Sequence, residues 1–191
     1  QLELPTDRTI LGSVGRFAEV KGYDVMLEAF GHFLEVWDGP GRPLLLLAGE
    51  GEQDEDLRDY VRRQDWSDDV RFLGWVEKVV PLLQSIDLFT LSSWSEGTSV
   101  SLLEAMSAGV PPVVTDVGGN ASVLGPELKD FLVTAGDPRA LARNWRRILR
   151  SPAAAEEAGR IARRRVEQHY SLRSMTDRYR RLYTRLHGRP S

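Results

Sequence analysis

Short apolar runs alternate with amphipathic helical patterns along the first 150 residues. The runs are four to six residues long and rich in aliphatic side chains, which is typical of buried strands. They predict strands over 9–14, 44–48, 70–73, 86–91, 112–115 and 130–133. Between and after them, apolar residues at spacings of three and four predict helices over about 23–37, 52–64, 77–84, 99–108 and 137–150.

Regular alternation of strands and helices is typical of βαβ units. It predicts an α/β fold, namely a doubly wound, Rossmann-like parallel sheet of about six strands with helices on both faces. Two more helical patterns follow from residue 153 to residue 186, and Ser171 is the predicted N-cap of the last one. That last helix carries an apolar stripe formed by Leu172, Met175, Tyr179, Leu182 and Leu186.

The composition narrows the class of protein. The 191 residues include 41% hydrophobic and 28% charged residues, which is typical of a folded globular domain. There is no cysteine, so disulfides, zinc ribbons, iron–sulfur clusters and cysteine nucleophiles are excluded. The three histidines are scattered without metal-ligand spacing, and no metal site is predicted. No leader is expected, because no basic and then apolar segment precedes Thr9.

The formal charge of −3 conceals a strong asymmetry. Residues 1–136 contain 10 basic and 23 acidic residues, whereas residues 137–191 contain 15 basic and 5 acidic ones. A basic tail can contact nucleic acid or an anionic membrane, or it can be an arginine-rich solvated surface. No aromatic platform or zinc spacing accompanies the arginines, so nucleic acid is not an expected partner. Peripheral membrane contact and a solvated helical surface both remain open.

Glycine occurs in each of the five loops that follow the first five strands. Missing side chains let main-chain N–H groups approach a ligand, and helix N-termini favour anions. After the first strand, Arg16 and Lys21 flank such a loop and supply the positive charge that a diphosphate needs. Neither the P-loop pattern nor a GxGxxG after the first strand is present, so these two nucleotide motifs are excluded.

Two glutamates stand out in the loop and helix after the fourth strand. Glu96 precedes a helix whose first free amides belong to residues near Thr98–Val100, and Glu104 lies about one and a half turns into that helix. A carboxylate beside free amides suits sugar hydroxyls, and Glu104 suits a ribose diol. The alternative is that Glu96 caps the helix and Glu104 is a solvated side chain. Trp37, Trp66 and Trp145 are predicted to pack in the core, while Trp75 and Trp94 lie on the loop edge.

The segment SEGTSVSLLEAMSAGVPPVVTDVGGN resembles the E-x7-E region of the family 4, or group 1, retaining glycosyltransferases. Five further motifs occur in the family's order: GRFAEVKG, LLLLAGEGE, VRFLGWV, IDLFTLSSWSEG and AGDPRALA. The resemblance covers residues 9–150. It implies the C-terminal, donor-binding half of a two-domain GT-B enzyme, whose ligand is a nucleotide sugar.

The resemblance also assigns roles to individual residues. Glu96, Arg16 and Lys21 are the implied catalytic residues, and no metal or other cofactor is expected. The implied donor site places the diphosphate at Arg16 and Lys21, the ribose at Glu104, and the sugar at Glu96. The remaining implied donor-binding residues are Gly15, then Gly74, Trp75 and Val76 beside the nucleobase, and the amides of Gly97, Thr98, Ser99 and Val100 beside the sugar. Many relatives have an aromatic residue and a glycine where this chain has Thr98 and Ser99, so the identity of the sugar stays open.

The implied domain organisation has three parts. Residues 1–8 correspond to an interdomain linker, 9–150 to the donor-binding domain and 151–191 to its helical extension. The partner is then an N-terminal acceptor-binding domain that this chain lacks. The expected role is sugar transfer to a glycan or lipid in polysaccharide biosynthesis, in the cytoplasm or at the inner face of the membrane. The alternatives are a GT-B sugar-nucleotide epimerase and a non-catalytic nucleotide-binding or interaction module.

Overall fold

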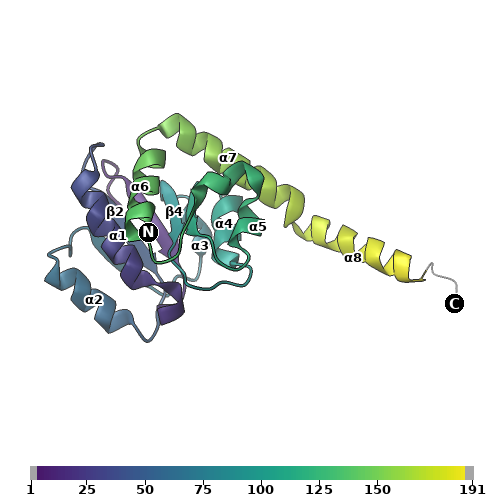
Figure 1. Cartoon of the computed structure of the whole chain (residues 1–191), viewed down its shortest axis with the longest axis horizontal. Coiled ribbons are helices and arrows are strands. Elements are labelled where there is room, and N and C mark those ends of the chain that lie inside the picture. The colour runs from purple at the N-terminus through teal and green to yellow at the C-terminus, as the bar shows by residue number, and fades with distance from the viewer. Residues whose placement is uncertain (1–3, 188–191) are drawn as a thin grey trace.

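A parallel sheet of six strands runs through the computed structural model, which describes residues 4–187 (Figure 1). The strands are β1 (Ile10–Val14), β2 (Leu44–Ala48), β3 (Val70–Gly74), β4 (Leu88–Leu91), β5 (Pro112–Thr115) and β6 (Leu132–Val133). Their order in the sheet is β3-β2-β1-β4-β5-β6, and every neighbouring pair is parallel. The predicted sheet is therefore confirmed. The first three residues of the predicted linker and the last four of the extension lie outside the described residues.

Helices cover both faces of this sheet. They are η1 (Glu19–Lys21), α1 (Tyr23–Val36), α2 (Asp54–Arg63), α3 (Val79–Leu83), α4 (Val100–Ser107), α5 (Asn120–Leu124), η2 (Pro126–Phe131), α6 (Pro138–Leu149), α7 (Pro152–His169) and α8 (Leu172–His187). One core cluster joins α1, α2 and α6 to the sheet, and a second joins α3, α4, α5 and α7 to its other face. The arrangement confirms the doubly wound fold.

The strand β2 shows why its sequence is an unbroken apolar run. Leu45 and Leu47 face the cluster of α1 and α6, whereas Leu44 and Leu46 face the cluster of α4 and α7. Side chains of a strand alternate between faces, so a strand covered on both sides must be apolar throughout.

The tryptophans predicted to pack do so. Trp145 is fully buried, and its Nε1–H donates to the Thr90 hydroxyl at 3.0 Å. Trp66 and Trp37 contact the rings of Phe30 and Phe33, at centroid distances of 6.0 and 5.1 Å. These three indole rings are therefore part of the core on the α1 and α6 face.

The prediction was wrong in two places near β6. A strand was predicted over 130–133, but only Leu132 and Val133 pair with β5, while Asp130 and Phe131 end the 3-10 helix η2. Pro126 starts η2, since proline fixes the helical φ angle and its missing N–H is not needed in a first turn. The short helix α5 was not predicted, because five residues are too few to show a helical period.

The two helical patterns predicted between residues 153 and 186 are the helices α7 and α8. α7 packs against α4 and α5, and α8 projects away from the domain (Figure 1). The Ser171 hydroxyl accepts the Ser174 N–H at 3.2 Å, so the predicted N-cap is confirmed. All five residues of the predicted stripe are exposed, between 48% and 74%. Among the described helices, none is long and apolar enough to cross a bilayer.

The order of the strands places a crevice at the carboxyl ends of β1 and β4. The chain leaves these two neighbours in opposite directions, because β1 continues toward β2 and β4 toward β5. Loops that diverge from adjacent strands open a crevice at this switch point, where sheets of this kind bind ligands. The predicted site residues Arg16 and Lys21 follow β1, and Glu96 follows β4.

Candidate functional site

The loops at this edge hold one another in place through their main chains. The N–H of Gly15 donates to Ala48 O at 3.0 Å, and the N–H of Phe17 donates to Glu50 O at 2.9 Å. A Cβ on Gly49 would overlap the carbonyl of Gly15, and a Cβ on Gly51 would overlap that of Phe17. The loops after β1 and β2 therefore pack so closely that Gly49 and Gly51 leave no room for a side chain.

The same holds on the other side of the crevice. A Cβ on Gly22 would overlap the carbonyl of Ser92, and both Gly118 and Gly119 touch main-chain carbonyls of the loop after β4. The expectation that these glycines open the edge to a ligand is therefore corrected, since what approaches them is a neighbouring loop. Gly22 and Gly118 also adopt positive φ angles of 61° and 54°, which disfavour other residues.

Gly97 is different from these packed glycines. A Cβ built on it meets no atom within 4 Å, and its φ angle is not in the left-handed region. Neither packing nor backbone geometry thus requires glycine at this position. The space that the absent side chain leaves opens to solvent, as expected where a ligand approaches the main chain.

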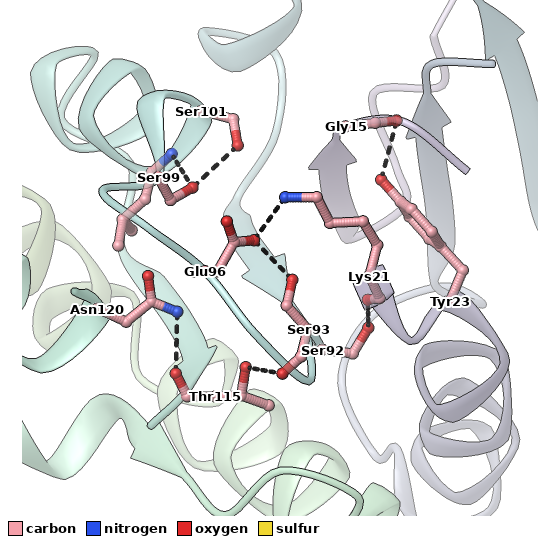
Figure 2. A network of polar contacts seen from close by, with 11 residues as sticks. Gly15, Lys21, Tyr23, Ser92, Ser93, Glu96, Ser99, Ser101, Thr115 and Asn120 are labelled. Carbon is pink, nitrogen blue, oxygen red and sulfur yellow. Dashed lines mark hydrogen bonds and ion pairs between the residues drawn. The ribbon is translucent and has the colours of Figure 1, made fainter. Parts of the chain in front are cut away.

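An ion pair between Lys21 and Glu96 spans the switch point. Lys21 Nζ lies 2.7 Å from Glu96 Oε1, and the Ser93 hydroxyl donates to the same oxygen at 2.7 Å (Figure 2). The Glu96 side chain is only 6% exposed, whereas that of Lys21 is 26% exposed. Within residues 4–187 the other oxygen, Oε2, accepts no hydrogen bond, so Glu96 keeps one oxygen for a ligand.

The N-terminus of α4 lies beside this carboxylate. Ser99 is its N-cap, and its hydroxyl accepts the N–H of Leu102 at 3.3 Å. The alternative in which Glu96 caps the helix is therefore wrong. In the described part of the chain, the N–H groups of Gly97, Thr98, Ser99, Val100 and Ser101 find no hydrogen-bond acceptor. Five free donors and a helix N-terminus favour an anionic or hydroxyl-rich ligand here.

A hollow of about 570 Å³ adjoins the ion pair on the β1 to β3 side. It brings together five of the predicted site residues: Gly15, Arg16, Trp75, Val76 and Glu104. Its other lining residues are Val14, Ala48, Gly49, Glu50, Glu77 and Val79. The predicted residues thus form two groups. One lines the hollow, and the other consists of Lys21, Glu96 and the N-terminus of α4, which lie outside the lining. Gly74 directly precedes Trp75 of the lining.

Side chains around the hollow differ in how they are held. Arg16 is exposed, and its guanidinium makes no hydrogen bond or ion pair within the described residues, so it is free for an anion. The Trp75 side chain is exposed (77% for the residue), and the main-chain N–H of Trp75 donates to Glu50 Oε1 at 3.2 Å. Glu104 is exposed on the wall of the hollow, which suits both the predicted ribose contact and the alternative of a solvated side chain.

Sequence reasoning missed three polar residues that hold the site. Glu50 fixes the main chain at Trp75, and Ser93 holds Glu96. The buried Tyr23 donates its O–H to the carbonyl of Gly15 at 3.3 Å. Burial raises the pKa of Tyr23 to about 12, the neighbouring Ser13 side chain lowers it in part, and the charge of Glu96 raises it further. Tyr23 therefore stays a neutral donor. Its helical spacing in α1 indicated only a core residue.

Trp94, predicted on the loop edge, falls outside the hollow, and the histidine His32 lies on a helix. Trp94 follows β4, but its ring lies against Gly136 and its Nε1 lies near Gly22, so the ring packs between loops and does not line the hollow. The His32 ring lies 3.8 Å from the carboxylate of Glu28 and 3.6 Å from that of Glu35, both in its own helix. No three His, Asp or Glu side chains of the described residues gather in a way that could hold a metal ion.

A larger hollow, of about 760 Å³, lies at the opposite edge of the sheet. Among its charged lining residues, Asp38 and Arg150 are paired with each other, and Asp38 also pairs with Arg146. Arg8 beside it is fully used, since it donates to three carbonyls and to Asp69. We place the candidate site at the smaller hollow and the neighbouring N-terminus of α4, where the Arg16 guanidinium and the amides of residues 97–101 have no partner among the described residues.

Comparison with known proteins gives a family and a fold. The family model for glycosyl transferases group 1 matches residues 1–165. The lipopolysaccharide core biosynthesis glycosyltransferase LpsE of Rhizobium meliloti is 29% identical over 179 residues, which are 94% of this chain and 51% of LpsE. The chain therefore spans about half the length of this relative.

Solved structures show the same architecture. Sucrose-phosphate synthase of Thermosynechococcus elongatus superimposes with a TM-score of 0.83 at 28% identity, over 97% of this chain and 47% of that one. HepE of Anabaena, solved with UDP, gives a TM-score of 0.84 at 21% identity, over 93% and 49% of the two chains. The fold is thus that of one half of a GT-B glycosyltransferase.

Proposed function

Because the chain belongs to the group 1 glycosyltransferases, we propose that it is the donor-binding half of an enzyme that transfers a sugar from a nucleotide sugar to an acceptor. The observation that carries the proposal is the Lys21–Glu96 pair beside five free main-chain N–H groups at the switch point. We propose that the transfer retains the anomeric configuration and needs no bound metal.

The residues of the site divide the donor into three parts. The free Arg16 guanidinium and the partly exposed Lys21 ammonium bind the diphosphate and stabilise the charge of the leaving group. Glu104 on the wall of the hollow holds the ribose, with the nucleobase beside the main chain of residues 74–76. Glu96 Oε2 and the amides that follow Gly97 hold the hydroxyls of the sugar. Since Lys21 already contacts Glu96, it links the diphosphate part of the site to the sugar part.

The acceptor and the place of action belong to the same proposal. LpsE is named for lipopolysaccharide core biosynthesis, and a glycan or lipid acceptor for the present protein agrees with that name. A second, acceptor-binding half is the proposed partner. Action in the cytoplasm, with a peripheral contact of the basic C-terminal helices at the inner face of the membrane, stays a prediction.

The test is a thermal-shift and calorimetric titration of the chain with UDP, GDP, ADP and their sugar conjugates. A ligand at ten times its Kd adds about 1.4 kcal/mol of stability, or roughly 3–6 °C in Tm for a chain of this size. We expect one nucleoside diphosphate series to do this and the matching nucleoside to do much less. Affinity should be the same with EDTA and with added Mg²⁺ or Mn²⁺. A tenfold tightening by metal would contradict metal independence, and no binding by any member would contradict the function.

Replacing Gly97 with Ala is expected to separate sugar binding from folding. The new methyl group meets no protein atom, so the free energy of unfolding should stay equal or rise by about 0.4–1 kcal/mol. The methyl group fills the space where the sugar approaches the amides, so affinity for the nucleotide sugar should fall about tenfold or more while that for UDP is kept. Ser95→Ala, an exposed change in the same loop, is the control. Unchanged binding of every nucleotide sugar would contradict this assignment of Gly97.

A further inference from the structure

The turn Val117–Asn120, between β5 and α5, lies directly against the segment 96–98 that follows β4. The N–H of Gly119 donates to Gly97 O at 2.9 Å. A Cβ on Gly118 would overlap the carbonyl of Glu96, and one on Gly119 would overlap that of Gly97. The turn therefore supports the segment through its bare main chain and fixes how far Glu96 and Gly97 stand from the sheet.

Asn120 connects this turn to the sheet through the amide nitrogen of its side chain, while the amide oxygen makes no hydrogen bond within the described residues. Asn120 is fully buried, and its Nδ2 donates to Thr115 O at 3.0 Å, while the Thr115 hydroxyl donates to Ser93 O at 2.8 Å (Figure 2). In the described residues Oδ1 has no hydrogen-bond partner. In Figure 2 this oxygen points toward the N-terminal turn of α4.

A buried acceptor without a partner destabilises the folded state, because it has lost its hydrogen bonds to water and has no hydrogen bond in the protein to replace them. The donor half of Asn120 adds little, because Thr115 O also accepts the N–H of Val117 at 3.0 Å. A leucine of similar shape would thus serve folding as well as the asparagine does. Folding stability does not explain the residue, and the nearby run of free N–H groups suggests what does.

We propose that Asn120 is a positioning residue for donor binding, which holds the segment 96–98 at the height where Glu96 and the amides after it meet the sugar. This inference rests on the proposed function. Asn120 does not touch the donor, since its side chain is buried behind the segment. Its free Oδ1 is the acceptor that restrains a main-chain N–H of this segment when the sugar is bound.

The test compares two near-isosteric variants by melting temperature and by calorimetry with UDP and the tightest of UDP-glucose, UDP-galactose and UDP-N-acetylglucosamine. Asn120→Leu should keep or raise Tm and bind UDP within about twofold of wild type, yet bind the UDP-sugar about tenfold more weakly. Asn120→Asp keeps the oxygen but buries a charge, so it should lower Tm and retain the preference for the UDP-sugar better than Asn120→Leu does. If Asn120 served folding alone, Tm and the affinity for the UDP-sugar would fall together in these variants.

Gly119→Ala provides the second route, because Gly119 has an ordinary φ of −84° and its only conflict is with the carbonyl of Gly97. It should reproduce the selective loss of UDP-sugar affinity, and the exposed Ser122→Ala is the matched control. The inference is overturned if the affinities for UDP and for the UDP-sugar fall equally. It is also overturned if Asn120→Leu or Gly119→Ala leaves both affinities unchanged. Either result leaves the proposed function standing. A wild-type chain that binds none of UDP, GDP, ADP and their sugar conjugates overturns the proposed function and this inference with it.

Discussion

Replacing Lys21 with Ala is expected to weaken both the fold and the diphosphate site. Glu96 is 6% exposed, and without Lys21 its carboxylate would keep only the hydrogen bond from Ser93. Removing one partner of a fully buried pair costs several kcal/mol, and the quarter-exposed Lys21 reduces this to about 2 kcal/mol. UDP affinity should fall by about 1.5–3 kcal/mol, the range for a hydrogen bond to a charged group.

Two variants separate these effects. Arg16→Ala should lower the affinity for UDP to a similar degree. It should change the free energy of unfolding by less than about 0.5 kcal/mol, because the free guanidinium makes no hydrogen bond or ion pair with any other described residue. The double variant Lys21→Ala, Glu96→Gln should recover most of the lost stability, since a neutral amide needs no cation, and should still bind UDP weakly. Denaturant unfolding and calorimetry measure both quantities. Wild-type stability in Lys21→Ala, or unaltered UDP binding in Arg16→Ala, would contradict the respective role.

The fold was predictable from the sequence because each element has a local signal. A strand covered on both faces, such as β2, must be apolar at every position, and the helices between the strands show their period clearly. The cap Ser171 also follows from local chemistry, because serine is a favoured N-cap residue. Where the local signal is too short, as in α5 and in the two-residue β6, the prediction missed the element or misplaced its ends.

The site was predictable only in part, because a sequence shows which residues are near an edge but not what faces them. The glycines of the edge loops look alike in the sequence, yet Gly49 and Gly118 are packed against other loops and Gly97 is open. Likewise, Glu96 could cap a helix or bind a ligand on spacing alone. Only the folded structure, in which Ser99 is the cap and Glu96 contacts Lys21 across the switch point, decides against the cap. Asn120 carries no signal in the sequence, since its unpaired oxygen exists only in the folded structure.

The 191-residue chain by itself is expected to bind a nucleotide sugar without transferring it. All candidate site residues lie along one edge of a single sheet, and the chain covers about half the length of LpsE. Transfer needs the acceptor within about 3–3.5 Å of the donor carbon, and positioning of this kind supplies roughly 7–11 kcal/mol of the barrier reduction. One wall of a cleft cannot position the acceptor in this way, so the rate should fall by a factor of about 10⁵–10⁸ from an ordinary value near 10 s⁻¹.

The measurement is product formation from the most tightly bound nucleotide sugar and a panel of sugar and lipid acceptors, with an acceptor-binding half added in a parallel reaction. Because donor binding is measured on the same sample, absence of product with a bound donor identifies the acceptor side as what is missing. Turnover near 1 s⁻¹ by the chain alone would show instead that this edge holds both substrates.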